Sequence, residues 1–271
     1  MYSLNKYTHE AMKTSFTLRL KSADRQLCNS VAQATISLID EIEQALSKYR
    51  EGGEVWQINQ MKAGETLFLN DICYECLQLG LEAYVETEGL FDITLGRQIE
   101  HTKSSAQGPA PEAKGQLMID PDRPAIHCIE PGREIDLGGI GKGFALDRAG
   151  KLVLELGIES AILSAGASTQ LAVGNEAWEI QLQGEGQTKA VSIKNQALSA
   201  SGTAIQGSHI VSPNQDSAEY ISNRVWVIDE TAAMADAYST AALLMNPEQL
   251  QILKTKVGGV FQNTDDGILP I

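Results

Sequence analysis

The stretch that decides the fold is residues 134–157, EIDLGGIGKGFALDRAGKLVLELG. Four of the six residues from 138 to 143 are glycines, and apolar side chains then recur at helical spacing. We expect a strand at 134–139 that delivers an aspartate into the turn, followed by a helix over about 142–156 that Gly157 ends. Glycines let the backbone come close to a ligand, and a helix N-terminus presents unpaired N–H groups that suit a phosphate.

This glycine-rich turn has two interpretations. Phe144 stands where the dinucleotide-binding fingerprint has its third glycine, and Gly143 follows Lys142 where a P-loop has Ser or Thr, so neither standard motif is present. A phosphate site would use Lys142 as a local cation. The alternative is a tight strand-to-helix turn whose glycines serve packing alone, and the spacing leaves both open.

A second candidate site lies on the helix expected from near Glu230 to Asn246-Pro247. Asp236 and Thr240 are four residues apart, so their oxygens lie on one face of that helix, among small alanines. Such a pair could hold Mg²⁺ if water and a substrate phosphate completed the coordination. The structural alternative is an aspartate favoured by the helix dipole and a threonine bonded to a backbone carbonyl.

The rest of the chain reads as many short strands and few helices. One helix is expected at 24–50, where Glu51-Gly52-Gly53 ends it. A second is expected from Asn70, its N-cap, to Gly89. Strands are expected at 11–21, 115–120, 125–130, 134–139, 160–166, 169–174, 178–183, 189–194, 197–202, 209–212 and 224–229. The pattern predicts an α+β fold of mixed or antiparallel sheets with packed helices. We expect a single domain over 1–271, with a mobile loop at about 101–116.

Composition excludes two classes of partner. The chain carries 21 Lys and Arg against 35 Asp and Glu, a formal charge of −14, so neither nucleic acid nor an anionic membrane surface is expected to bind. No apolar run approaches the roughly 18 residues of a membrane span, and neither a signal peptide nor a lipobox is visible, so a cytoplasmic location is expected. Cys73 and Cys76 are expected to be buried apolar residues rather than a redox or zinc pair.

Seven segments in order along nearly the whole chain resemble the FAD:protein FMN transferases of ApbE type. Asp136-Leu-Gly-Gly-Ile-Gly-Lys142-Gly is close to the Asp-Leu-Gly-Gly-Ile-Ala-Lys-Gly of that family. The other segments are Ala11-Met12-Lys13-Thr14-Ser15-Phe16, Glu54-Val-Trp-Gln-Ile-Asn59, Thr87-Glu-Gly-Leu-Phe-Asp92-Ile-Thr94, Ala200-Ser201-Gly202, His209-Ile-Val-Ser-Pro213 and Ala235-Asp236-Ala-Tyr-Ser-Thr240-Ala.

The resemblance implies an ApbE-like fold and an enzyme that uses Mg²⁺ to transfer the FMN half of FAD onto a Thr or Ser of an acceptor flavoprotein, releasing AMP. The acceptor segment would be Ser/Thr-Gly-Ala-Ser/Thr. Asp236, Thr240 and the carbonyl of Gly139 would bind the metal. The flavin nucleotide site would be lined by Met12, Leu90, Phe91, Asp92, Asp136, Lys142 and His209. Asp92 and His209 are the first candidates for the group that takes the acceptor proton.

Departures from the family pattern lie on the flavin and acceptor side. Lys13 replaces a glycine, Ser212 replaces an aspartate, and Arg97 follows Gly96 where proline is usual. The helix segment that carries Asp236 and Thr240 and the glycine-rich turn after Asp136 keep the family pattern. Two alternative functions therefore stay open. One is an FAD pyrophosphatase that gives FMN and AMP, and the other is a non-catalytic flavin- or nucleotide-binding protein with the same fold.

Overall fold

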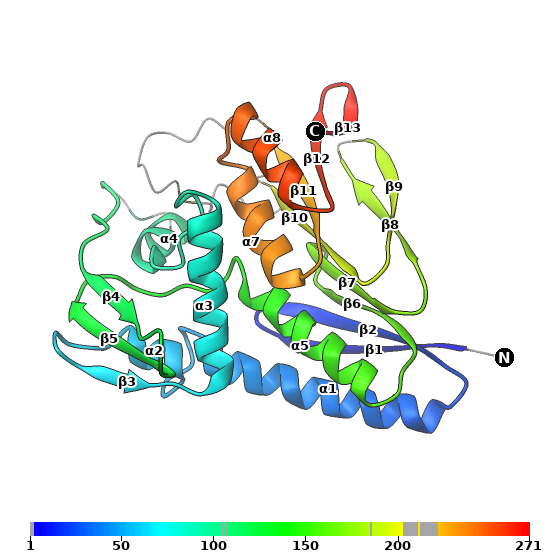
Figure 1. The fold of residues 1–271 in the computed structure, drawn as a ribbon, viewed down its shortest axis with the longest axis horizontal. Coiled ribbons are helices and arrows are strands. Elements are labelled where there is room, and N and C mark those ends of the chain that lie inside the picture. The colour runs from blue at the N-terminus through cyan, green and yellow to red at the C-terminus, as the bar shows by residue number, and fades with distance from the viewer. Residues whose placement is uncertain (1–2, 105, 107, 185, 203–210, 212–221) are drawn as a thin grey trace.

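A computed structural model describes residues 3–104, 106, 108–184, 186–202, 211 and 222–271 (Figure 1). The largest element is an eight-stranded sheet in which every neighbouring pair is antiparallel. Its strands, in spatial order, are β1 (Ser3–Ala11), β2 (Thr14–Ser22), β6 (Ser160–Ala165), β7 (Thr169–Gly174), β10 (Gln196–Gly202), β11 (Arg224–Asp229), β12 (Gly259–Thr264) and β13 (Gly267–Pro270). The predicted α+β class is confirmed.

The first hairpin contains one strand that the period-two pattern predicted, β2, and one that it did not, β1. The alternation over residues 11–21 is confirmed, because Phe16, Leu18 and Leu20 are buried in β2. A second strand, β1, precedes it, and the two are joined by Met12 and Lys13, which both have positive φ, 51° and 59°. Two such residues form the tight turn whose twist matches that of antiparallel strands. Lys13 thus occupies a backbone conformation that favours glycine.

Helices cover one face of the sheet and a small hairpin covers the other (Figure 1). α1 (Arg25–Leu46), α5 (Gly141–Glu155) and α7 (Ala232–Ala242) bury their apolar stripes in the main core. A second core, which includes Leu198, Trp226 and Ile268, lies under the hairpin of β8 (Trp178–Gln183) and β9 (Thr188–Ile193). The central strands β10 and β11 are therefore buried on both faces, and α7 packs on them and on β7.

Caps explain where the helices begin. Asp24 accepts the N–H groups of Gln26 and Leu27 at the start of α1. The predicted cap Asn70 accepts that of Cys73 at the start of α3 (Asp71–Glu86). The predicted end of the first helix at Glu51 is wrong, since α1 ends at Leu46 and the glycines instead precede α2 (Glu54–Ile58). The predicted helix end at Asn246-Pro247 is wrong, since α7 ends at Ala242 and these two residues instead open α8 (Pro247–Lys256) with a capping box.

A smaller sheet stands beside α3, in the order β3 (Thr66–Phe68), β5 (Ala125–Glu130) and β4 (Gln116–Ile119). Sequence reasoning missed α4 (Gly96–Lys103), so the first three residues of the predicted loop at 101–116 are helical. The predicted strand at 134–139 is also wrong. Only an isolated bridge joins Leu95 to Glu134, because the Asp136 N–H is taken by the Ile93 carbonyl and the chain then turns into α5.

Candidate active site

The glycine-rich turn and the Asp236 helix meet in the structure. Lys142 Nζ lies 3.3 Å from Asp236 Oδ2. A Cβ on Gly139 would lie 3.4 Å from Thr240 Oγ1 and 2.9 Å from a ring carbon of Phe91, so the backbone of this turn passes directly beside both side chains. Five residues singled out from separate parts of the sequence are therefore neighbours at one place.

Two contacts one helical turn apart hold α5 against the start of α7. A Cβ on Gly143 would lie 2.1 Å from the backbone oxygen of Ala232, so only glycine allows this approach. Four residues further along α5, the Asp147 carboxylate accepts the N–H groups of Ala232 and Ala233 at 2.7 and 2.8 Å. These N–H groups belong to the first turn of α7 and have no partner within the helix. Asp147 therefore acts as a cap supplied by a neighbouring helix.

The two carboxylate oxygens of Asp236 have different surroundings, although the residue as a whole is only 3% exposed. Oδ1 accepts hydrogen bonds from Ser199 Oγ at 3.0 Å and Thr169 Oγ1 at 3.2 Å. Oδ2 is buried and accepts no hydrogen bond, and its contact with Lys142 is an ion pair without hydrogen-bond geometry. A buried oxygen left in this state is costly unless a ligand completes it.

The atoms around Oδ2 are suited to a small hard cation. Thr240 donates its hydroxyl to the Asp236 carbonyl at 3.0 Å, so Oγ1 acts as an acceptor toward other groups, with Ser201 Oγ at 3.4 Å and the Gly139 backbone alongside. Carboxylate, hydroxyl and carbonyl oxygens are the ligands that Mg²⁺ accepts. Among the described residues, no three His, Cys, Asp or Glu side chains group as a metal site. A cation here would thus depend on oxygens from the backbone, from hydroxyls and from a bound ligand.

Asp136 lies at the centre of a cluster of lysines. Its Oδ1 accepts the Gly138 N–H at 2.8 Å, and its Oδ2 forms ion pairs with Lys48 Nζ at 2.9 Å and Lys103 Nζ at 3.6 Å, without a well-angled hydrogen bond. Burial opposes ionisation of Asp136, but Lys103, Lys48 and the Gly138 N–H outweigh it and hold the pKa of this carboxyl below its usual value. In a chain of charge −14, this cluster concentrates cations beside the glycine-rich turn.

The turn that carries Met12 is connected to this cluster through the side chain of Lys13. The ammonium of Lys13, its neighbour in the turn, lies 3.6 Å from the centre of the Tyr49 ring. The Tyr49 hydroxyl donates to Glu100 at 3.0 Å, and Glu100 also pairs with the Asp136 partner Lys48 at 3.2 Å.

Leu90, Phe91 and Asp92 lie in the segment between α3 and α4. Both oxygens of Asp92 are engaged. Oδ1 accepts the N–H and the hydroxyl of Thr94, each at 2.7 Å, and Oδ2 lies 3.2 Å from Arg133 Nη1. Asp92 thereby shapes the turn that places Phe91 against Gly139. His209 lies outside the described residues.

Sequence reasoning missed several residues of this site. Three of them, Thr169, Ser199 and Lys103, come from β7, β10 and α4, and Lys48 comes from the segment after α1. They belong to no local pattern, so only the fold brings them to Asp236 and Asp136. Asp147 carried a weak signal, because it lies four residues after Gly143 on the same helix face. Cys73 and Cys76 are free and fully buried, as predicted, and burial raises the pKa of both thiols far above the usual range.

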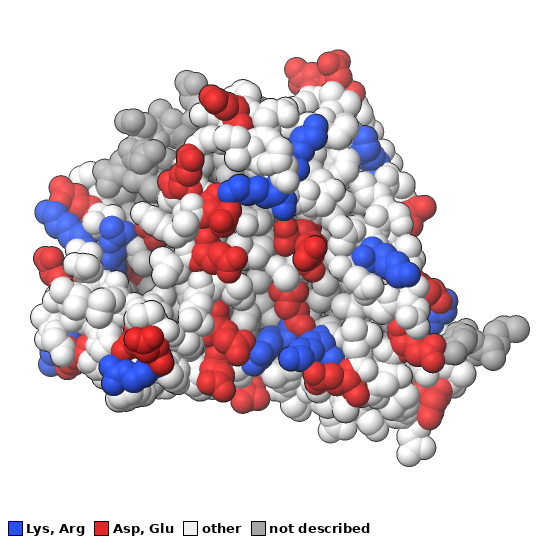
Figure 2. All heavy atoms as spheres, viewed as in Figure 1, with Lys and Arg blue, Asp and Glu red and all other residues white. Residues whose placement is uncertain are grey.

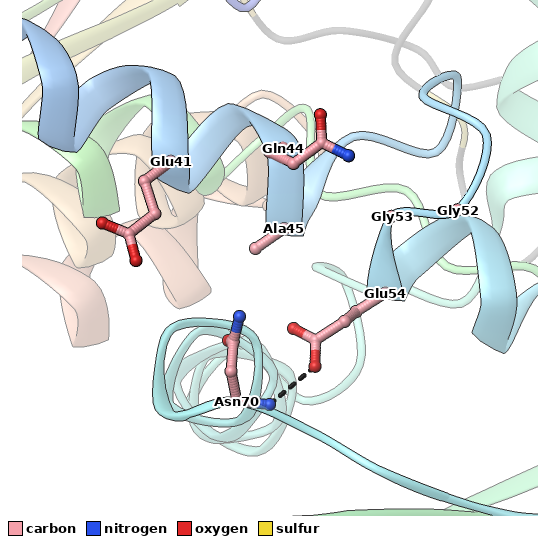
Figure 3. A pocket seen from close by; sticks show the side chains of 7 residues that line it. All are labelled: Glu41, Gln44, Ala45, Gly52, Gly53, Glu54 and Asn70. Atoms are coloured by element: carbon pink, nitrogen blue, oxygen red, sulfur yellow. Dashed lines mark hydrogen bonds between the residues drawn. The ribbon is translucent and has the colours of Figure 1, made fainter.

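Charged side chains and a small pocket mark other parts of the described surface. Asp and Glu side chains spread over the face that carries α3 and α5, with Lys and Arg interspersed (Figure 2). A pocket of about 220 Å³ opens between α1 and the starts of α2 and α3, where Glu54 accepts the Asn70 N–H (Figure 3). Neither Asp236 nor Asp136 lines it, and no residue of the glycine-rich turn does. Among the described residues, no helix is long and apolar enough to cross a membrane.

The fold and site together define an α+β protein with two buried aspartates beside a glycine-rich turn. Lys142 of the turn contacts Asp236, and Lys48 and Lys103 pair with Asp136. The chain belongs to the ApbE family, whose family model matches residues 12–261. It is similar to proteins named FAD:protein FMN transferase, a class of transferase enzymes. The protein from Rhodobacter capsulatus is 28% identical over 79% of this chain and 47% of its own length. The protein from Escherichia coli strain K12 is 23% identical over 95% and 83%. The chain thus spans about half the length of the first relative.

Solved structures show the same fold. The apo form of the flavinyl transferase ApbE from Pseudomonas stutzeri matches with a TM-score of 0.85 and 20% identity, over 100% of this chain and 94% of that one. The ApbE protein from Thermotoga maritima matches with a TM-score of 0.85 and 23% identity, over 100% and 97%. The expected ApbE-like fold and the membership of the family are therefore confirmed.

Proposed function

We propose that this protein is a magnesium-dependent FAD:protein FMN transferase. It would move the FMN moiety of FAD onto a Thr or Ser hydroxyl of an acceptor flavoprotein and release AMP. Family membership and the names of the relatives support the flavin transferase class. The observation that carries the finer proposal is the buried, unbonded Oδ2 of Asp236, which faces Lys142 beside the Gly139 turn and Thr240.

The residues around the turn suit the pyrophosphate of FAD. The first turn of α5 presents backbone N–H groups, and Lys142 adds a positive charge that its bond to the Gly138 carbonyl at 2.7 Å holds in place. Asp236, Thr240 and the Gly139 carbonyl would hold Mg²⁺, which supplies charge to offset that of the pyrophosphate oxygens. Phe91 is only 5% exposed and packs against this turn, so it supports the Gly139 backbone, and its contact with the flavin nucleotide stays a prediction.

The transfer itself exchanges one phosphorus–oxygen bond for another. The acceptor hydroxyl oxygen bonds to the phosphorus of the FMN half, and the bond from that phosphorus to the bridging oxygen breaks. AMP leaves with the bridging oxygen, and the hydroxyl proton passes to a base. Little covalent chemistry falls to the protein, so positioning and charge supply most of the catalysis. Asp92 and His209 stay the predicted candidates for the base.

The acceptor is predicted to present a Ser/Thr-Gly-Ala-Ser/Thr segment, and neither nucleic acid nor a membrane is expected as a partner. The cytoplasmic location stays a prediction from the sequence. The single domain over 1–271 also stays a prediction.

One assay tests the proposed function. The protein is incubated with FAD, Mg²⁺ and an acceptor domain, and AMP, free FMN and protein-bound flavin are measured together. We expect AMP and bound flavin in equal amounts. Free FMN in place of bound flavin would indicate the pyrophosphatase, and a lack of AMP with every divalent metal would leave binding alone. Asp236→Ala should abolish AMP release. Thr35→Val, a buried change in α1 away from the site, should leave it unchanged.

A further inference from the structure

The two hydroxyls beside Asp236 are themselves held in fixed positions. Thr169 on β7 and Ser199 on β10 are directly opposite each other in the antiparallel register, and both are completely buried. Their hydroxyl oxygens lie 3.2 Å apart. Ser239 on α7 donates to Ser199 Oγ at 3.3 Å, so the helix that carries Asp236 is tied to the same pair. If both hydroxyls turned away from Asp236, its buried Oδ1 would be left without a hydrogen-bond donor.

Their effect is to make the two oxygens of Asp236 inequivalent. A carboxylate oxygen has two in-plane lone pairs, and on Oδ1 both are taken by the Thr169 and Ser199 hydroxyls, at 3.2 and 3.0 Å. Oδ2 has no hydrogen bond and lies 3.3 Å from Lys142 Nζ, which also donates to the Gly138 carbonyl of the glycine-rich turn at 2.7 Å. A cation at this site therefore finds one free oxygen on Asp236. Coordination through both oxygens would require breaking two buried hydrogen bonds to a charged group.

We infer that Thr169 and Ser199 are positioning residues that determine which cation the site selects. By restricting Asp236 to one coordinating oxygen, they favour a small octahedral ion such as Mg²⁺ over Ca²⁺, which takes more ligands at longer distances and readily accepts both oxygens of a carboxylate. This inference rests on one part of the proposed function, the binding of a cation by Asp236, and does not depend on the transfer reaction. It assigns a role in metal choice to two residues that would touch neither metal nor substrate.

Metal binding to the full chain tests it without turnover. Mg²⁺ and Ca²⁺ are titrated separately into the metal-free protein, and the two dissociation constants are measured by calorimetry and by the shift in melting temperature. The variants are Thr169→Val, Ser199→Ala and their combination. Thr169→Val keeps the shape and the β-branched side chain of a strand residue. Thr169→Ser keeps the hydroxyl as a rescue variant, and Thr35→Val is the matched control, because its hydroxyl donates only to the Val31 carbonyl within α1.

In the wild type we expect Mg²⁺ to bind more tightly than Ca²⁺. In the combined variant the preference for Mg²⁺ over Ca²⁺, measured as the ratio of the two dissociation constants, should fall by at least about tenfold. Each single variant should show about half of that effect on a logarithmic scale. Thr169→Ser and Thr35→Val should stay within about twofold of the wild type. Where the combined variant does not fold, the single variants decide the question.

Three results would overturn the inference. The first is an unchanged ratio of the Mg²⁺ and Ca²⁺ dissociation constants in a folded Ser199→Ala or Thr169→Val variant, and the second is an equal shift of that ratio in Thr35→Val. The third is that Asp236→Ala binds both ions as tightly as the wild type, or that the wild type binds neither. A shift in the ratio without any AMP formation would sink the proposed transferase while this inference stands. AMP formation with an unchanged ratio would overturn this inference and leave the transferase intact.

Discussion

Replacing Asp147 by asparagine should change how the stability of the protein depends on pH. The Asp147 carboxyl lies between α5 and the N-terminus of α7, where it accepts two N–H groups. Burial is the largest influence on this carboxyl and raises its pKa to about 6, with the charges of Asp229 and Asp236 acting in the same direction, although the two N–H groups favour the ionised form. Asparagine has nearly the same shape and carries no titrating proton.

The sign and size follow from proton linkage. An aspartate in the unfolded chain has a pKa of about 3.9, so the folded state binds this proton more tightly. The contribution of Asp147 to the free energy of unfolding is therefore complete below about pH 4 and is lost as the pH rises through about 6. A shift of about two units corresponds to about 3 kcal/mol. Because the side chain keeps some exposed surface, which screens this energy, we expect a loss of about 1 to 3 kcal/mol.

The assay compares two unfolding curves, so that all other titrating groups cancel. Urea denaturation of the wild type and Asp147→Asn, followed by circular dichroism, gives the free energy of unfolding at intervals from pH 4 to pH 8. The wild type should lose 1 to 3 kcal/mol relative to the variant across this range. Asp265→Asn, an exposed change in the turn between β12 and β13, is the control and should give a nearly constant difference. Parallel curves for wild type and Asp147→Asn would refute the reasoning.

Three further predictions concern the metal, the glycines and the thiols. Chelation by EDTA should abolish AMP release, and Mg²⁺ at about 100 times its dissociation constant should stabilise the wild type by about 2.7 kcal/mol but not Asp236→Ala, as measured by thermal unfolding; an equal shift in both would remove Asp236 from the metal site. Gly143→Ala should lower stability by more than about 3 kcal/mol, since its Cβ meets the Ala232 backbone at 2.1 Å, whereas Gly141→Ala, with ordinary contact at 3.7 Å, should cost less than about 1 kcal/mol in the same urea assay. Cys73 and Cys76 should react with a thiol reagent only after unfolding in urea, because both are completely buried; rapid labelling of the native protein would contradict this.

Local patterns in the sequence predicted the elements whose cause is local. The alternation in β2, the Asn70 cap of α3 and the helix after the glycine-rich turn all depend on residues within about one turn of each other. The wrong predictions concern elements that depend on contacts between residues far apart in the chain. The segment 134–139 has the composition of a strand, but no full partner strand lies beside it, so it stays a connection with one bridge. α4 was missed because the Gly, Arg and Gln that begin it give no helical period.

The sequence by itself determined the chemistry available at the site. Gly139, Lys142, Asp236 and Thr240 could be singled out because each pair lies within one turn of the chain, where spacing fixes relative position. The tertiary structure decided what that chemistry faces. Antiparallel pairing of β7 and β10 places Thr169 opposite Ser199, and the close contact at Gly143 sets α7 over them, so that one oxygen of Asp236 is bonded and the other is free. No local pattern records such an arrangement, because it arises from strands and helices far apart in the chain.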